Sequence, residues 1–151
     1  MTADSSAHSA RQSWLGILAR ADAGLLHRHL SQTDPLPSFV HLRQPEIGLT
    51  MVRGRVGAEG EGFNLIEATL TRASIVDDEG HTGHAYVLGR DEARAVAIAR
   101  LDAALQSDTR HAVLMASVVD PLAAIEAQRR AAIEARAAGT EVRFFTMATG
   151  R

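Results

Sequence analysis

The sequence predicts an α+β fold: an antiparallel sheet of about four to five strands, with an N-terminal helix and two or more later helices packed on one side. Three patterns support this fold class. Apolar residues recur at helical spacing toward both ends of the chain, they alternate with polar residues between Phe39 and Leu88, and short turn sequences separate the alternating segments. Short connections favour antiparallel hairpins, because a parallel return needs a long crossover.

The first helix is predicted by a capping pattern and an apolar stripe. Ser9 and Gln12 have the spacing of a capping box, which satisfies free backbone groups at a helix start. Residues 1–8 precede it and are expected to be disordered. The stripe recurs at intervals of three, four and seven over about 20 residues; its members are Trp14, Leu15, Leu18, Leu25 and Leu26. Pro35 and Pro37 predict the end of the helix.

The middle of the chain predicts strands, because it is rich in alternating β-branched and aromatic residues. The predicted meander consists of residues 39–42, 49–56, 63–76 and 84–88, and a further strand at 142–147 is expected to join it. Turn sequences at 45–48, 57–62 and 77–80 separate the strands. The glycine-rich turn 57–62 reads as a hairpin loop, because its glutamates would repel a phosphate. The acids at 77–79 are expected at a solvated turn tip.

The alternation within residues 63–76 predicts which side chains share a face. One face carries Ile66, Ala68, Leu70 and Val76 and is expected to be buried. The other carries Glu67, Thr69 and Thr71 and is expected to meet solvent or a partner. Arg72 falls among the apolar set, so it is expected to reach past the sheet edge or to pair with an acid.

Two later helices are predicted from their start signals. Asp91 is placed to cap the first of them, with core-facing residues Ile98, Leu101 and Leu105. Asp120 and Pro121 start the second, with the stripe Leu122, Ile125, Ala132 and Ile133 and a stop at Gly139. Residues 107–119 fit either a helix or a strand. The sequence has no repeat and no long linker, so residues 1–151 are expected to form a single domain.

Composition excludes several classes of function. The 16 basic residues, all of them arginine, are balanced by 18 acidic residues, which gives a formal charge of -2. This balance argues against a nucleic acid or a membrane surface as partner. The chain has no cysteine, which excludes thiol nucleophiles and iron–sulfur ligation. With no signal sequence or membrane span predicted, we expect a cytoplasmic protein.

The sequence predicts no autonomous active site. His27 and His29 point to different sides of a helix, and His81 and His84 have no third ligand nearby, so no metal site is expected. No serine lies in a nucleophile elbow, and no carboxylate pair stands out for acid–base chemistry. The best anion candidate is the segment Gly89-Arg90-Asp91, where a strand leads into a helix N-terminus. Asp91 competes with an anion for the same backbone donors.

Four sequence fragments together identify a family. They are Arg11-Gln-x-Trp14 with Leu18, Ala-Thr-Leu-Thr-Arg-Ala at 68–73, Gly-Arg-Asp at 89–91, and Phe-Phe-Thr-Met at 144–147 followed by Gly150. In this order and spacing the chain, from about Arg11 to Arg151, resembles the PhnG family. That family is the small G subunit of the bacterial carbon–phosphorus lyase system.

The resemblance implies a subunit of a phosphonate-degrading complex that is used under phosphate starvation. In that family the G subunit acts with the H, I and L subunits, which together displace adenine from ATP with an alkylphosphonate. The product is α-D-ribose 1-methylphosphonate 5-triphosphate. The I subunit is taken as catalytic, and the iron–sulfur J subunit later cleaves the carbon–phosphorus bond. The implied partners are therefore H, J, L, K and chiefly I. ATP is a substrate of the complex, and no cofactor is expected on this chain.

The family's motifs still need a role, although none of their residues carries over as catalytic. We expect the following residues at an interface or facing an anion: Glu67, Thr69, Thr71, Arg72, Gly89, Arg90 and Asp91. Guanidinium groups suit either role, because they bind carboxylate and phosphate through two hydrogen bonds. The alternative is a free-standing nucleotide-binding or small-anion-binding protein or enzyme that uses residues 89–91. As a subunit, the isolated chain is expected to be inactive and to be able to form a homodimer.

Overall fold

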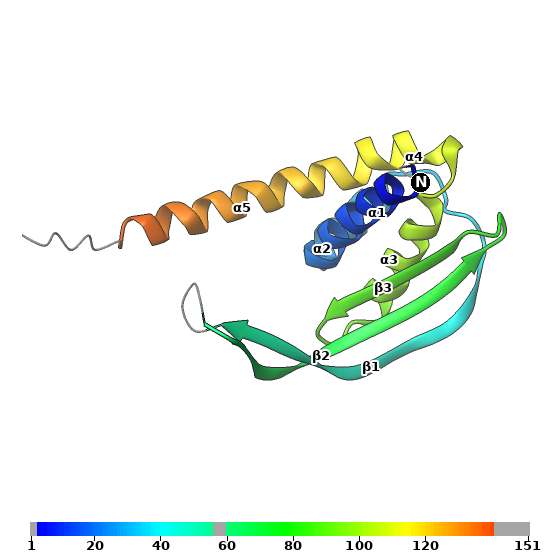
Figure 1. The fold of residues 1–151 in the computed structure, drawn as a ribbon. Helices are drawn as coiled ribbons and strands as arrows, with labels where there is room; N and C mark the ends of the chain where they lie inside the picture. The colour runs from blue at the N-terminus through cyan, green and yellow to red at the C-terminus, as the bar shows by residue number, and fades with distance from the viewer. Residues whose placement is uncertain (1–2, 56–59, 141–151) are drawn as a thin grey trace, which may run out of the picture.

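The computed structural model of this chain describes residues 3–55 and 60–140 and has the predicted α+β class (Figure 1). Its strands are β1 (Phe39–Arg55), β2 (Gly62–Asp77) and β3 (Thr82–Leu88). Its helices are α1 (Ala3–Arg20), α2 (Ala23–Leu30), α3 (Glu92–Ala104), α4 (Asp108–Leu114), the π-helical turn η1 (Met115–Val119) and α5 (Asp120–Ala138). The helices lie on one side of the sheet, as predicted.

The sheet has the antiparallel order β1-β2-β3. The described residues thus form three strands, and the expected number of four to five is wrong for them. The predicted strands 39–42 and 49–56 are one continuous strand, because register shifts between His41 and Glu46 accommodate Pro45 without ending β1. The strand predicted at 142–147 lies outside the described residues.

The first predicted helix is two helices. Asp22 separates them as the N-cap of α2, and its Oδ1 accepts hydrogen bonds from the backbone N–H groups of Gly24 and Leu25 at 2.9 and 3.1 Å. Because α1 begins at Ala3, Ser9 lies inside the helix and the predicted capping box is wrong. Residues 3–8, expected to be disordered, belong to the first turns of α1.

The face of β2 that packs against the helices is the opposite of the one expected. The buried side chains are Thr71, Ala73, Ile75 and Asp77. Arg72 lies on the open face, and Ile66, predicted to be buried, is exposed. The apolar alternation that suggested the opposite assignment continues into a part of β2 that no helix covers.

Helix α3 lies directly on β3, and small residues make this contact possible. A Cβ atom on Gly83 would lie 1.8 Å from the carbonyl oxygen of Ala99, so only glycine fits at this position. Ile98, Leu101 and Leu105 of this region are fully buried, as predicted. The core also contains Leu18, Leu26, Ile75, Val87, Val118 and Val119.

Residues 107–119, left open by the sequence, are helical. They form α4 and η1, and the helical backbone continues from η1 into α5. Asp120 therefore begins α5 but does not cap it with its side chain. Leu122 is buried, whereas Ile125 and Ile133 of the same predicted stripe are exposed. From residue 127 to residue 138 every side chain of α5 is exposed.

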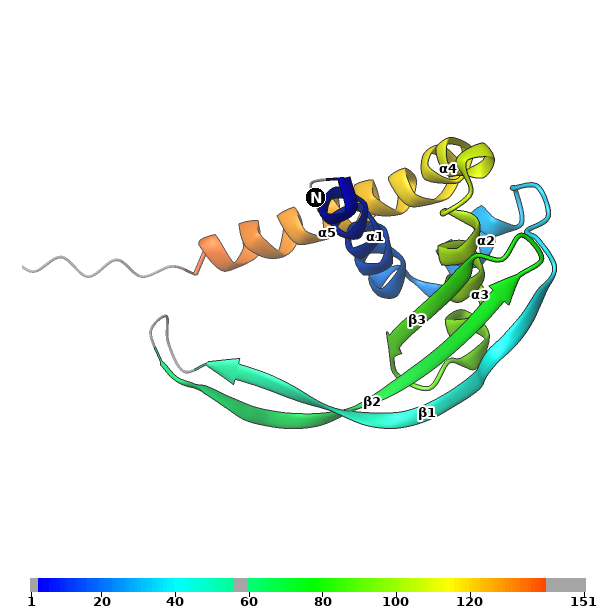
Figure 2. The same cartoon turned by 45° about the vertical axis from the view of Figure 1, so that its right-hand side comes forward.

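Two segments project from the body on the same side (Figures 1 and 2). One is the distal half of α5, residues 127–138. The other is the paired part of β1 and β2 beyond the end of β3, residues 49–55 and 62–69, which we call the hairpin arm. Both lie outside the core, so they contribute surface that the other described residues do not cover.

Candidate functional site

Two of the sequence motifs meet at the corner between β2, β3 and α3. The hydroxyl of Thr71 is fully buried, donates to the carbonyl of Gly89 at 2.6 Å and accepts from the N–H of Asp91 at 3.1 Å. The N–H of Gly89 donates to the carbonyl of Thr69 at 2.8 Å. Gly89 has a φ of 96°, which favours glycine. Residues 69–73 and 89–91 therefore form one hydrogen-bonded unit.

Asp91 caps α3, as predicted. Its Oδ1 accepts a hydrogen bond from the N–H of Arg94 at 2.9 Å, so this backbone donor is already used and is not free to bind an anion. Arg90 beside it is exposed and has no hydrogen bond or ion pair within residues 3–55 and 60–140. The corner thus holds its own backbone together and presents one guanidinium outward.

Arg72 pairs with an acid, which confirms one of the two predicted outcomes. Its Nε donates to Oε1 of Glu46 at 2.6 Å. The same oxygen accepts from Arg43. The hydrogen bond from Arg43, followed by that from Arg72, lowers the pKa of Glu46 below its ordinary value. Two guanidiniums share one carboxylate, which leaves an excess positive charge on this face.

The open face of the sheet has the composition of a protein interface. Tyr86 lies opposite Arg72 on the neighbouring strand, and both side chains are exposed. Other exposed apolar side chains of the three strands are Val40, Leu42, Ile66 and Leu88. Tyrosine and arginine within an apolar surround are typical of residues that contribute most to protein binding.

The hairpin arm carries the remaining predicted residues, and it is more apolar than β2 alone suggests. Glu67 is paired with Met51, and Thr69 with Leu49. The exposed large apolar residues on this face, which we call the arm stripe, are Leu49 and Met51, with Ile47 at the base of the arm. Phe63 and Leu65 are exposed as well, but they lie beyond the register shift between Val52 and Arg53, on the face of Gly54. The polar face predicted for β2 is thus part of an apolar surface, because β1 supplies half of it.

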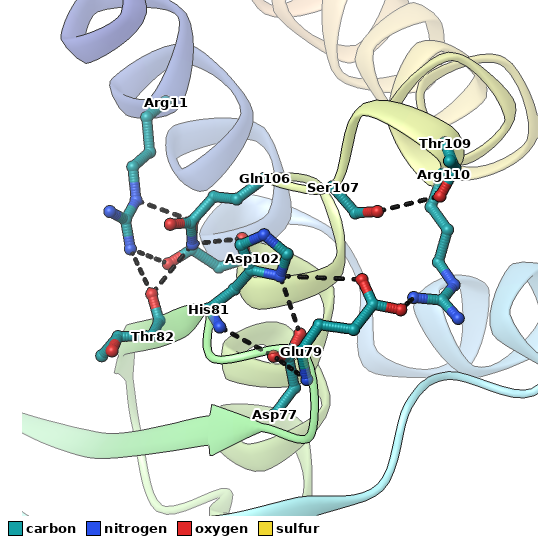
Figure 3. Close-up of polar contacts among 10 residues, drawn as sticks. All are labelled: Arg11, Asp77, Glu79, His81, Thr82, Asp102, Gln106, Ser107, Thr109 and Arg110. Atoms are coloured by element: carbon teal, nitrogen blue, oxygen red, sulfur yellow. Dashed lines mark hydrogen bonds and ion pairs between the residues drawn. The ribbon is translucent and has the colours of Figure 1, made fainter.

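Sequence reasoning missed a buried carboxylate in α3. Asp102 is fully buried and accepts two hydrogen bonds from Arg11, from Nε at 3.0 Å and from Nη2 at 2.7 Å (Figure 3). It also accepts from Trp14 Nε1 at 3.0 Å and from the N–H of His84 at 2.9 Å. This network joins α1, α3 and β3 and gives the motif residues Arg11 and Trp14 a structural role. The sequence feature that could have indicated this site is the position of Asp102 directly after Leu101, which was expected to face the core.

The acidic turn after β2 is also structural. Oδ1 of Asp77 accepts from the N–H groups of Glu79 and His81 at 3.0 and 2.8 Å, and Asp77 is buried. Glu79 forms an ion pair with Arg110 of α4 (Figure 3). The prediction of a purely solvated turn tip is wrong for Asp77, because its carboxylate stabilises the turn from within.

Within the part of the chain that the structure describes, no three histidine, cysteine or acidic side chains are grouped to hold a metal ion. Over the same residues, no helix has the length and apolarity to cross a membrane. The motif residues at the corner bind one another. Arg90 and Arg72 lie on exposed surface, and Arg72 is paired there with Glu46.

Comparison with known proteins agrees with the order and spacing of the motifs. The sequence model of the PhnG family, described as phosphonate metabolism protein PhnG, matches residues 9–150. A protein of Rhizobium meliloti (strain 1021), named alpha-D-ribose 1-methylphosphonate 5-triphosphate synthase subunit PhnG, is 40% identical over 149 residues. The alignment covers 99% of this chain and 95% of that relative. The chain therefore belongs to the PhnG family.

Proposed function

We propose that this chain is a subunit of an α-D-ribose 1-methylphosphonate 5-triphosphate synthase in phosphonate metabolism, and that it contributes contacts rather than reacting groups. The name of its relative from Rhizobium meliloti supports the complex. The exposed arm stripe supports the mode of action. The proposed site of this activity is the cytoplasm, where ATP is available.

The arm stripe is the observation that carries the proposal. Leu49 is 66% exposed and Met51 is 51% exposed, and they lie with Ile47 on one face of β1. Large apolar patches on a protein surface mark interaction sites. A two-stranded hairpin is also marginally stable by itself, so a partner that packs on the stripe would stabilise the arm as well.

The proposed reaction is the displacement of adenine from ATP by an alkylphosphonate. This chain would act in it with the H, I and L subunits, with I as its chief contact, and the J and K subunits would complete the system. The contacts of the motif residues favour a supporting role for this chain, because Thr71, Gly89 and Asp91 are hydrogen-bonded to one another. Arg90, which is exposed, remains available to a carboxylate or phosphate of the complex, whereas Arg72 is already paired with Glu46.

The rival function, a free-standing anion-binding protein that uses residues 89–91, has less support. A helix N-terminus binds an anion through free backbone N–H groups. Here the carboxylate of Asp91 accepts from the N–H of Arg94, and the N–H of Asp91 donates to Thr71. An anion would have to displace a carboxylate already held by the chain.

Reconstitution separates the two functions. The measurement is adenine release from ATP with methylphosphonate, by the H, I and L subunits with and without this chain. The proposal predicts that release needs this chain and that the isolated chain releases no adenine. Undiminished release without it, or saturable ATP binding by the isolated chain that Arg90→Ala abolishes, would favour the rival.

A further inference from the structure

The first half of the outer edge of β3 is closed by side chains. The N–H of His84 donates to Oδ2 of the buried Asp102 at 2.9 Å. The carbonyl of Thr82 accepts from Arg11 Nη2 and from Gln106 Nε2, both at 2.8 Å. These backbone groups therefore have partners, and no further strand can pair with them.

The second half of this edge is open. The hydrogen bond from Gly89 N–H to the Thr69 carbonyl fixes the alternation of the ladder, so the odd-numbered residues of β3 pair with β2. The N–H and carbonyl groups of Tyr86 and Leu88 therefore point away from β2. Over the described ranges, neither residue's backbone has a hydrogen-bond partner on that side. An unpaired strand edge is a template for pairing with another chain.

The open edge lies beside two adjoining hollows, which together we call the groove. The first lies between α1 and β3, has a volume of about 460 Å³, and is lined by Leu15, Gly16, Ala19, His84, Tyr86 and Ile98. The second shares Ala19 with the first, has a volume of about 490 Å³, and is lined by Leu88 at the end of β3 and Ile133 of α5. Both of these apolar side chains are exposed in the described chain. The groove thus offers room and apolar surface beside free backbone groups.

The part of the groove at α5 has an excess of positive charge. Four arginines line it, Arg20, Arg94, Arg129 and Arg130, against two glutamates, Glu126 and Glu134. Arg20 and Arg129 share Glu126 at 3.6 and 3.9 Å. The Nε of Arg94 is buried and has no hydrogen-bond partner among the described residues. This surface favours a carboxylate at close range.

We infer that the open edge of β3 binds an extended segment of a partner subunit by strand addition. The segment pairs with the backbone of Tyr86 and Leu88, places apolar side chains in the groove, and brings a carboxylate to the arginines at α5. The inference rests on the proposed function, because it takes the segment from another subunit of the synthase. A second copy is disfavoured, because edge-to-edge pairing about a twofold axis would bring two arginine-rich grooves together.

Hydrogen exchange in the complete complex tests the pairing. We expect the amides of Tyr86 and Leu88 to exchange at least about tenfold more slowly in the assembled complex than in the isolated chain. Unchanged exchange at both amides in an assembled complex overturns the inference and leaves the proposed function standing. Failure of the wild-type chain to assemble with the other subunits overturns both. Slowing in the isolated chain at rising concentration would indicate a second copy and overturn the choice of partner.

A matched pair of variants tests the backbone contact. Tyr86→Pro removes an N–H that β2 does not use, which an edge strand tolerates, whereas Tyr86→Thr removes the same ring and keeps the N–H. We expect the proline variant to bind its partners at least about tenfold more weakly than the threonine variant. Equal affinities of two folded variants contradict strand addition, and if the proline variant unfolds, the exchange experiment decides.

Charge reversal tests the carboxylate. Arg130→Glu is expected to weaken assembly by roughly tenfold at low salt and to reduce its salt dependence. Arg28→Glu changes the charge by the same amount on the exposed surface of α2 and is expected to have little effect. Equal losses for the two variants would show that only net charge matters and would overturn the assignment of the groove.

Discussion

The guanidinium of Arg11 on α1 makes two hydrogen bonds, of 3.0 and 2.7 Å, to the buried carboxylate of Asp102 on α3. Trp14 and the backbone of His84 complete the shell of this carboxylate. A buried charge is tolerated only when it is paired and hydrogen-bonded. The motif residues Arg11 and Trp14 therefore hold α1 against α3 and β3.

Removing the charge of Asp102 should destabilise the fold. Asp102→Asn removes the counter-charge of Arg11, which is partly exposed, and replaces an acceptor oxygen with an NH2 group that cannot accept the same hydrogen bonds, so it should cost about 1–3 kcal/mol. Urea unfolding followed by circular dichroism gives the change in the free energy of unfolding. Asp78→Asn, in an exposed turn, is the control and should change stability by less than about 0.5 kcal/mol. A similar small change at Asp102 would contradict the role of the network.

The contact between β3 and α3 should not accept a side chain at Gly83. Its Cβ would meet the backbone of Ala99, so Gly83→Ala must displace α3 and should cost about 3 kcal/mol or more. Gly48→Ala is the matched control, because no atom lies within 4 Å of a Cβ at Gly48. Thermal unfolding of both variants measures the difference, and a Gly83→Ala protein as stable as Gly48→Ala would show that the helix is not seated so closely.

The hydroxyl of Thr71 should be needed for the corner between β3 and α3. Thr71→Val keeps the shape but leaves the N–H of Asp91 and the carbonyl of Gly89 unpaired, which costs about 1–3 kcal/mol. Thr71→Ser keeps the hydroxyl and should lose less. The order of stability expected in urea unfolding is wild type, serine, then valine. If valine were as stable as serine, the hydroxyl would not hold the corner.

The ion pairs on the open face should be lost only in acid. The pKa of Glu46 is lowered in the folded chain from its ordinary value of 4.5, so its contribution to stability is present above that value and disappears as the pH falls through the lowered pKa. NMR titration of the Glu46 side-chain carboxyl measures this directly. The double variant R43Q/R72Q should return the pKa toward the ordinary value, and an unchanged titration in it would contradict the assigned cause.

The sequence could predict the contacts of residues whose role depends on neighbouring residues in the chain or on charge alone. Asp91 precedes a helical pattern, and it caps α3. Arg72 lies among apolar residues of a strand, which indicated either a side chain that reaches past the sheet edge or an acidic partner, and the structure shows the partner, Glu46. The antiparallel order of the strands also follows from short turns between them.

The buried face of β2 could not be predicted from alternation, for a physical reason. Helix α3 approaches so closely that Gly83 and small residues fill the contact, and they give little apolar signal. The hydroxyl of Thr71 is buried because the turn before α3 satisfies it. Meanwhile exposed residues such as Ile66 are apolar although no part of the described chain covers them.

Contacts between segments that are far apart in the chain also could not be predicted from the sequence. The donors to Asp102 from α1 lie 91 and 88 residues away along the chain, so no local pattern relates them. The arm stripe could not be predicted for the same reason, because the register of β1 and β2 sets which of their residues share a face. Both features depend on pairing that is set by the fold as a whole.

The most direct test of the proposed role is assembly with a weakened arm stripe. Leu49→Ser removes an exposed side chain, so it should leave the isolated chain stable, and Val113→Ser removes one of similar exposure on α4, 61% against 66%. Native mass spectrometry of each variant with the H, I and L subunits measures the assembled fraction. We expect Leu49→Ser to weaken assembly by about tenfold and Val113→Ser to leave it unchanged. Equal assembly of the two variants and the wild type would contradict the role of the hairpin arm.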